Sequence, residues 1–279
     1  MSHSRSSAAA PARPVPRTPT LTGELLAEFA GTAILILFGV GVVAQVVAGQ
    51  NGDNDSIHWA WGLGVTFGIY VAGRTTGAHL NPAVTIALAV FQGFSWKKVL
   101  PYSVAQFLGA FVAALIVRWV YAGPIDGVDP GHTYDTQGIF STLPGTNVTI
   151  GGAFLDQVVG TAILVFLIFA VSQAKAMPPA ANLAPLIVGL IVVAIGFAWG
   201  SNAGYAINPA RDFGPRLASF LTGYDTAMRE PGGSFYFWVP IVAPVIGGLI
   251  GGALYKVLVE RHLPDQDAAE PEGRVHTDD

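Results

Sequence analysis

The sequence predicts an all-α membrane protein with six transmembrane helices and two re-entrant half-helices, arranged as an inverted repeat. The first observation is composition: of the 279 residues, 52% are hydrophobic and only 11% are charged, whereas soluble domains carry about 25% charged residues. The second is that the apolar residues gather in segments of membrane-spanning length. The third is that two short sequence motifs recur in the second half of the chain at nearly the same offset.

The spans follow from segment length, because a helix needs about 20 mostly apolar residues to cross a bilayer. Six segments qualify, at about residues 22–48, 57–74, 99–121, 153–173, 184–201 and 234–258. Two further apolar segments, at about 82–92 and 209–222, are too short to cross and each opens with Asn-Pro-Ala. Apolar segments of this length are typical of re-entrant helices.

The repeat is visible in two unrelated words. Gly31-Thr-Ala-Ile-Leu recurs from Gly160, an offset of 129 residues, and Asn81-Pro-Ala recurs from Asn208, an offset of 127. Each half, about 22–121 and 152–258, therefore holds three spans and one half-helix. Because three is odd, the second half starts from the opposite face of the membrane, and such inverted repeats place their site near the midplane.

The two tripeptides are predicted to begin helices inside the membrane. Asn is a good N-cap and Pro suits the first helical position. A helix start leaves free N–H groups and a partial positive charge of about half a unit, and irregular backbone at this depth is tolerated where it lines a cavity. Two starts related by inversion are expected to meet, and their positive ends repel cations. The residues concerned are Asn81, Pro82, Ala83, Asn208, Pro209 and Ala210.

The ends and loops predict the orientation. Residues 1–20 are rich in Ser, Ala, Pro and Arg, which predicts a disordered tail. With the N-terminus inside, the inner segments hold ten Lys and Arg residues and the outer segments four. The positive-inside rule then places both termini, including the tail 261–279, in the cytoplasm, and the expected location is the cell membrane.

With Gly77-Ala-His-Leu-Asn-Pro-Ala-Val-Thr and Ala206-Ile-Asn-Pro-Ala-Arg-Asp-Phe-Gly-Pro, the chain resembles the major intrinsic proteins, the aquaporins and glycerol facilitators, over about residues 22–258. The resemblance implies an aquaporin-like channel domain over residues 21–260, a homotetramer, and passive passage of small neutral solutes. It also implies that protons and ions are excluded.

The resemblance also implies a selectivity filter. The four positions that form the family's narrowest ring correspond to Trp61, Gly196, Tyr205 and Arg211. Water-selective members typically carry His where Gly196 stands, and Arg211-Asp212 is typical of the glycerol branch, so the implied solutes are glycerol and water, with urea as a further candidate. Aromatic rings offer a broad apolar surface to the carbon edge of glycerol, and Arg offers donors to its hydroxyls.

Further residues receive roles from the same resemblance. Glu28 and its repeat counterpart Gln157 are expected to brace the two half-helix loops, together with Asp212. Gln157 departs from the family's Glu, although an amide can still bond backbone groups. Tyr205 stands where Phe is common, so its hydroxyl either narrows the filter or bonds the solute. Backbone carbonyls expected to face the lumen are those of Gly77, Ala78, His79, Leu80, Gly204, Tyr205 and Ala206.

Other function classes find little support. The net charge of −4 gives no nucleic-acid signature, the absence of cysteine excludes thiol chemistry, and His79 alone does not indicate a metal. No cofactor is expected, and without a nucleophile–base pair or phosphate loop we expect no enzyme. Two alternatives remain: a water-selective channel, and an ion-coupled secondary transporter that would use Glu24, Glu28 or Asp156.

Overall fold

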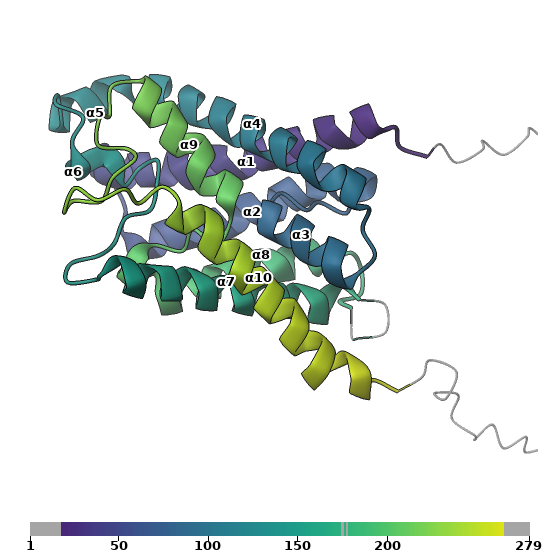
Figure 1. Cartoon of the computed structure of the whole chain (residues 1–279). Helices are drawn as coiled ribbons and strands as arrows, with labels where there is room; N and C mark the ends of the chain where they lie inside the picture. Colours follow the sequence, from purple (N-terminus) through teal and green to yellow (C-terminus); the bar gives the residue numbers. More distant parts are fainter. Residues whose placement is uncertain (1–17, 174–175, 177, 265–279) are drawn as a thin grey trace, which may run out of the picture.

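The computed structural model describes residues 18–173, 176 and 178–264, and the described residues form ten α-helices and a short 3-10 helix (Figure 1). The first repeat contains α1 (Leu21–Val47), α2 (Asn54–Thr76), α3 (Pro82–Phe91) and α4 (Trp96–Val120). The second contains α7 (Ile150–Ser172), α8 (Ala184–Ala203), α9 (Pro209–Leu221) and α10 (Val239–Leu258), followed by η1 (Glu260–His262). Residues 1–17 and 265–279, most of the two predicted tails, lie outside the described residues.

The predicted order of six spans and two half-helices is confirmed, with two differences. The last span begins at Val239 rather than near 234, because residues 231–238 form turns and Pro240 occupies the first turn of α10, a position that proline favours. Between the repeats, α5 (Ala122–Val128) and α6 (Tyr134–Gln137) form where we expected only a loop.

The second span, α2, is the least apolar of the six. Five helices in the described part of the chain are long and apolar enough to cross a membrane: α1, α4, α7, α8 and α10. With 23 residues, α2 is about 34 Å long, enough for a hydrocarbon core of about 30 Å. It packs between α1 and α8, so it completes the bundle as the sixth span.

Corresponding helices of the two repeats make corresponding contacts. In the first repeat α1 packs on α2 and α4, and in the second α7 packs on α8 and α10, while α2 and α8 join the two repeats. Each half-helix packs on the last span of the other repeat, α3 on α10 and α9 on α4. Figure 1 shows α9 reaching inward from the side of α5 and α6, and α3 reaching inward from the opposite side, where both ends of the described chain lie.

Glycines allow the spans to approach closely. A methyl group at Gly247 or Gly251 of α10 would overlap the backbone carbonyls of Val158 or Ala162 on α7. At the junction of the repeats, a methyl group at Gly62 of α2 would lie 2.6 Å from the carbonyl oxygen of Gly189 on α8. These backbone contacts hold the helices that surround the half-helices, as small residues do in lipid.

Candidate channel and selectivity filter

The two Asn-Pro-Ala segments meet at the centre of the bundle. Asn81 caps α3 by accepting a hydrogen bond from the N–H of Ala83 (2.9 Å), and Asn208 caps α9 by accepting from the N–H of Ala210 (3.0 Å). Each side-chain amide also donates to the loop before the other half-helix, Asn81 to the carbonyl of Ile207 and Asn208 to that of Leu80, both at 2.8 Å. An amide has two N–H donors, so one N–H of each asparagine remains for a solute.

Both asparagines line a cavity of about 820 Å³ inside the bundle. Trp61, Tyr205 and Arg211 line it at the end nearer α5 and α6, and Arg74, Ser172 and Asn182 line it at the other end. Its wall is mostly apolar, with Leu35, Val65, Ile69, Val84, Leu164 and Val192 among its residues. Polar groups are thus confined to the half-helix loops and the two ends, as in most small-molecule sites.

Glu28 braces the first half-helix loop through a fully buried carboxylate. One oxygen accepts from the hydroxyl of Thr76 (2.5 Å) and the N–H of His79 (3.0 Å). The other accepts from the N–H of Leu80 and the amide of Gln106, both at 2.8 Å. Four donors on one carboxylate stabilise the charge without a cation and hold the loop that leads into Asn81.

Gln157 occupies the corresponding place in the second repeat, and its bonds differ. Its amide oxygen accepts from the N–H of Ile207 (3.1 Å), and its amide nitrogen donates to the carbonyl of Gly204 (2.5 Å). A carboxylate could not make the second bond, because it has no donor. The neighbouring Asp156 accepts from Asn202 (3.2 Å). The geometry therefore agrees with a brace at Gln157, made with a different set of donors and acceptors.

At the end of the cavity nearer α5 and α6, the structure brings together Trp61, Tyr205 and Arg211, three of the four predicted filter residues. The guanidinium of Arg211 lies over the Trp61 ring at 3.8 Å from its centroid, a cation–π geometry. Within the described residues, no side-chain hydrogen bond ties this guanidinium to the protein. Its donors are therefore available to a solute, and the guanidinium and the two aromatic rings line the same end of the cavity.

Gly196 lies behind Tyr205 rather than among the cavity-lining residues of the described chain. A methyl group at Gly196 would come within 2.9 Å of the Tyr205 ring and 2.7 Å of Nδ1 of His58. The Tyr205 hydroxyl is 2.9 Å from that same Nδ1. Its partner in the structure is thus His58, which we did not single out from the sequence.

Most of the residues whose carbonyls are predicted to face the lumen line the cavity. Gly77, Ala78, His79, Leu80, Tyr205 and Ala206 line the cavity, and Gly204 is not among the described residues that do. The carbonyls of Leu80 and Gly204 already accept hydrogen bonds from Asn208 and Gln157. The His79 ring is packed against Phe94 and Tyr102 and its Nδ1 lies 3.1 Å from the Thr85 hydroxyl, as expected for a structural histidine.

Asp212 holds α9 to the loops on the side of the bundle where α5 and α6 lie. It accepts from the N–H and the hydroxyl of Thr142 (2.8 and 2.7 Å) and forms a fully buried ion pair with Arg216 (2.8 Å). Arg216 in turn donates to the carbonyls of Thr142 and Ala227. The pair therefore joins the half-helix that carries Arg211 to the loop segments before α7 and after α9. Sequence reasoning did not identify Arg216.

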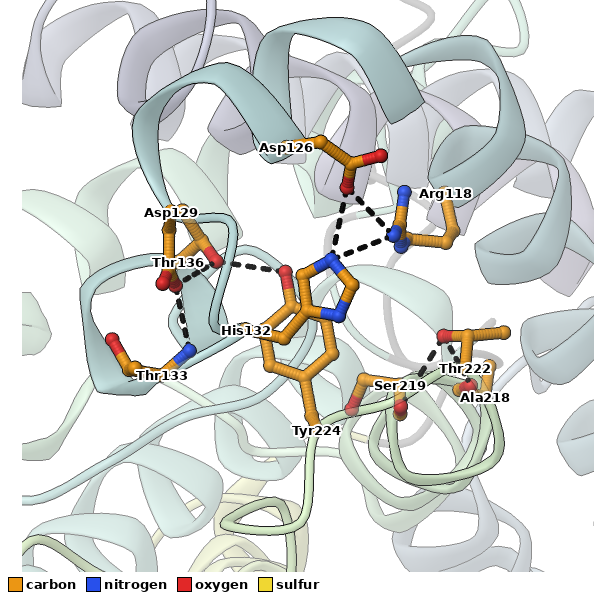
Figure 2. A network of polar contacts seen from close by, with 10 residues as sticks. All are labelled: Arg118, Asp126, Asp129, His132, Thr133, Thr136, Ala218, Ser219, Thr222 and Tyr224. Atoms are coloured by element: carbon orange, nitrogen blue, oxygen red, sulfur yellow. Dashed lines mark hydrogen bonds and ion pairs between the residues drawn. The ribbon is translucent and has the colours of Figure 1, made fainter.

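A second polar network covers the same face (Figure 2). Arg118 at the end of α4 bonds Asp126 of α5 (2.9 Å), whose same oxygen lies 2.9 Å from Nε2 of His132. The His132 ring stacks on Tyr224 (5.0 Å between centroids), whose hydroxyl lies 2.7 Å from that of Thr136. The hydrogen bond from His132, together with the charge of Arg118, holds the pKa of the Asp126 carboxyl below its usual value. The network thus joins α4, the α5–α6 segment and the chain after α9.

Comparisons with known proteins agree with this architecture. The family profile "Major intrinsic protein" matches residues 16–255. The glycerol uptake facilitator protein of Pseudomonas aeruginosa is 43% identical, covering 91% of this chain and 96% of that protein. The corresponding protein of Escherichia coli K12 is 42% identical, covering 89% and 92%.

Two eukaryotic proteins are also similar. A probable aquaglyceroporin-2 of Gibberella zeae is 45% identical over 85% of this chain and 72% of its own. The X-ray structure of the aquaglyceroporin from Plasmodium falciparum superimposes with a TM-score of 0.79 at 34% identity, covering 87% of this chain and 98% of that chain. By its sequence, its inverted repeat and its two opposed half-helices, this chain belongs to the major intrinsic protein family.

Proposed function

We propose that the protein is a passive channel for glycerol and other small uncharged solutes, which also passes water and excludes protons and ions. The observation that supports this most strongly is the pair of reciprocally bonded asparagines, each heading a half-helix and each lining one cavity. Relatives at 42–45% identity named as glycerol facilitators and aquaglyceroporins support the choice of solute.

The mechanism follows from the charges along the path. A neutral solute exchanges water for the guanidinium of Arg211 and then for the free N–H of each asparagine, while its carbon edge contacts Trp61 and Tyr205. A cation meets the fixed charge of Arg211 and the positive ends of α3 and α9, and it also loses its hydration. No conformational cycle is needed, so flux follows the solute gradient.

The alternatives are less well supported. Two observations count against a water-selective channel: such channels typically carry His where this chain has Gly196, and the relatives are named as glycerol facilitators and aquaglyceroporins. An ion-coupled transporter needs a titratable group on the solute path. Glu24 is paired with Lys98 (2.7 Å), Glu28 accepts four hydrogen bonds, and Asp156 bonds Asn202. None of the three is among the described residues that line the cavity.

The membrane setting completes the proposal. The protein crosses the membrane several times, and we propose the cell membrane as its location, with both termini in the cytoplasm on the basis of the Lys and Arg count. The α5–α6 face would then be extracellular. We further propose a homotetramer, each subunit with its own channel, and a channel function without catalysis or cofactor.

The direct test is stopped-flow light scattering of proteoliposomes in glycerol, urea and sorbitol, with protein-free vesicles as the control. We expect rapid shrinkage on mixing, then rapid re-swelling in glycerol and none in sorbitol. Glycerol re-swelling no faster than in empty vesicles would refute the proposal. Rapid shrinkage without glycerol re-swelling would indicate the water-selective alternative, and a dependence on an ion gradient would indicate the coupled transporter.

A further inference from the structure

His58 is a histidine beside the filter that the proposed function does not use. It lies on α2, three residues before Trp61, and is half-buried. Its Nδ1 is 2.9 Å from the hydroxyl of Tyr205, which lies 147 residues further along the chain. The two ring centroids are 5.3 Å apart, and the His58 ring also meets Phe197 of α8 edge-on at 5.0 Å.

Two glycines on α8 make room for this ring. A methyl group at Gly196 would come within 2.7 Å of Nδ1, and one at Gly200 within 3.1 Å of Cε1. The same methyl groups would also press on the Tyr205 ring, at 2.9 and 3.3 Å. Gly196 and Gly200 are one helical turn apart, so together they form a flat recess. The volume without a side chain at Gly196 is therefore filled by His58 and Tyr205 and is not open lumen.

The recess decides where the Tyr205 ring stands. Tyr205 is 5% exposed and lines the cavity together with the stacked pair of Trp61 and Arg211. With its hydroxyl bonded to His58 and its ring against two glycines, the ring can neither turn its hydroxyl into the lumen nor withdraw toward α8. Without His58, the part of the recess that the imidazole fills would be empty, and the Tyr205 ring could move into it.

We propose that His58 is a positioning residue for solute size: it fixes the Tyr205 ring and so sets the width of the filter for three-carbon polyols. This inference rests on the proposed glycerol channel. The imidazole acts through Tyr205 and does not contact the solute. Gly196, Tyr205 and His58 then act together. The imidazole of His58, from α2, occupies space that a side chain at position 196 of α8 would otherwise fill.

The test compares permeability to a four-carbon polyol, erythritol, with permeability to glycerol in the same proteoliposomes. In H58A we expect the erythritol-to-glycerol ratio to rise about fivefold, the population change expected when one hydrogen bond between uncharged groups is lost. Y205F should raise the ratio as well. The double variant H58A/Y205F should match the larger single effect, because both changes break the same bond.

Two further variants keep the test decisive. In H58N the shorter amide places a polar atom near the position of Nδ1, and we expect a ratio close to that of the wild type. Trp59→Ala removes a 49%-exposed ring one residue away on the same helix and should leave the ratio unchanged. Should H58A fail to fold, a wild-type ratio in H58N with a raised ratio in Y205F supports the proposal. A raised ratio in H58N with a wild-type ratio in Y205F overturns it.

Three results would overturn the inference. The first is an unchanged erythritol-to-glycerol ratio in H58A, and the second is a rise in the double variant H58A/Y205F equal to the product of the two single rises. The third is a rise of the ratio in Trp59→Ala as large as that in H58A. The proposed function fails separately, by absence of glycerol flux through the wild-type protein. Intact wild-type glycerol flux with an unchanged ratio in H58A would therefore remove only the role of His58.

Discussion

Glu28 and Gln157 brace the two half-helix loops with different sets of hydrogen bonds. We therefore expect both Glu28→Gln and Gln157→Glu to destabilise the protein. Glu28 accepts two hydrogen bonds on each carboxylate oxygen. In Glu28→Gln one oxygen becomes an NH₂ group, so the backbone N–H of either His79 or Leu80 loses its acceptor whichever way the amide turns. Each hydrogen bond to a charged group contributes about 1.5–3 kcal/mol, so the free energy of unfolding should fall by about that amount.

The reverse substitution, Gln157→Glu, restores the family's usual residue and should still destabilise this chain. A carboxylate oxygen would face the carbonyl of Gly204 in place of the donor that bonds it at 2.5 Å, close to Asp156. Loss of this bond and the unpaired carbonyl cost about 1–3 kcal/mol, before any cost of the buried charge.

The assay for both variants is thermal unfolding in detergent followed by tryptophan fluorescence, together with glycerol flux in proteoliposomes. Gln50→Glu, which changes the same atoms at an exposed loop position, is the matched control and should unfold at the wild-type temperature. Equal melting temperatures for Gln157→Glu and the wild type, with equal flux, would refute the assignment of the brace.

Three other perturbations address the end of the bundle where α5 and α6 lie. Arg211→Val should raise proton or cation leak in proteoliposomes under a membrane potential, because it removes the fixed charge over Trp61; an unchanged leak would count against the barrier role. Asp212→Asn leaves Arg216 buried without its counter-ion and should lower the free energy of unfolding by about 3–5 kcal/mol; an unchanged melting temperature would contradict this. Because the pKa of Asp126 is lowered in the folded state, its carboxylate stabilises the fold above the usual pKa of about 3.9 and loses this effect as pH falls through the lower, folded-state value. The difference in melting temperature between the wild type and Asp126→Asn should therefore be largest near neutral pH and shrink below about pH 4, and a constant difference would contradict the network in Figure 2.

Most of the architecture could be predicted from local sequence properties. Hydropathy located the spans, and Asn-Pro-Ala located the starts of α3 and α9 to the residue, because capping chemistry is local. The predicted start of α10 was five residues too early, because the residues before Val239 are apolar, as in a spanning helix, although they form turns. The short α5 has seven residues, including Gly and Pro, and α6 has only four, so no periodic pattern marks them.

The parts of the site that sequence reasoning missed depend on contacts between distant segments. His58 reads as one polar residue in an apolar helix, and only the fold brings it to Tyr205. Arg216 follows Asp212 by one helical turn, a spacing that predicts an ion pair, but its bonds to Thr142 and Ala227 require the loops to be in place. The Gln157 brace was expected, yet the atoms that carry it became clear only from the positions of Gly204 and Ile207.

The central physical claim is that two half-helices meet, start to start, in the middle of the membrane. An experimental density map of the purified protein in lipid and glycerol tests it most directly. We expect the amides of Asn81 and Asn208 side by side on one lumen at mid-bilayer depth, each bonded to the loop of the other repeat at about the 2.8 Å found here. A map with the two asparagines on separate surfaces, or with the loops before them exposed to bulk water, would contradict the account.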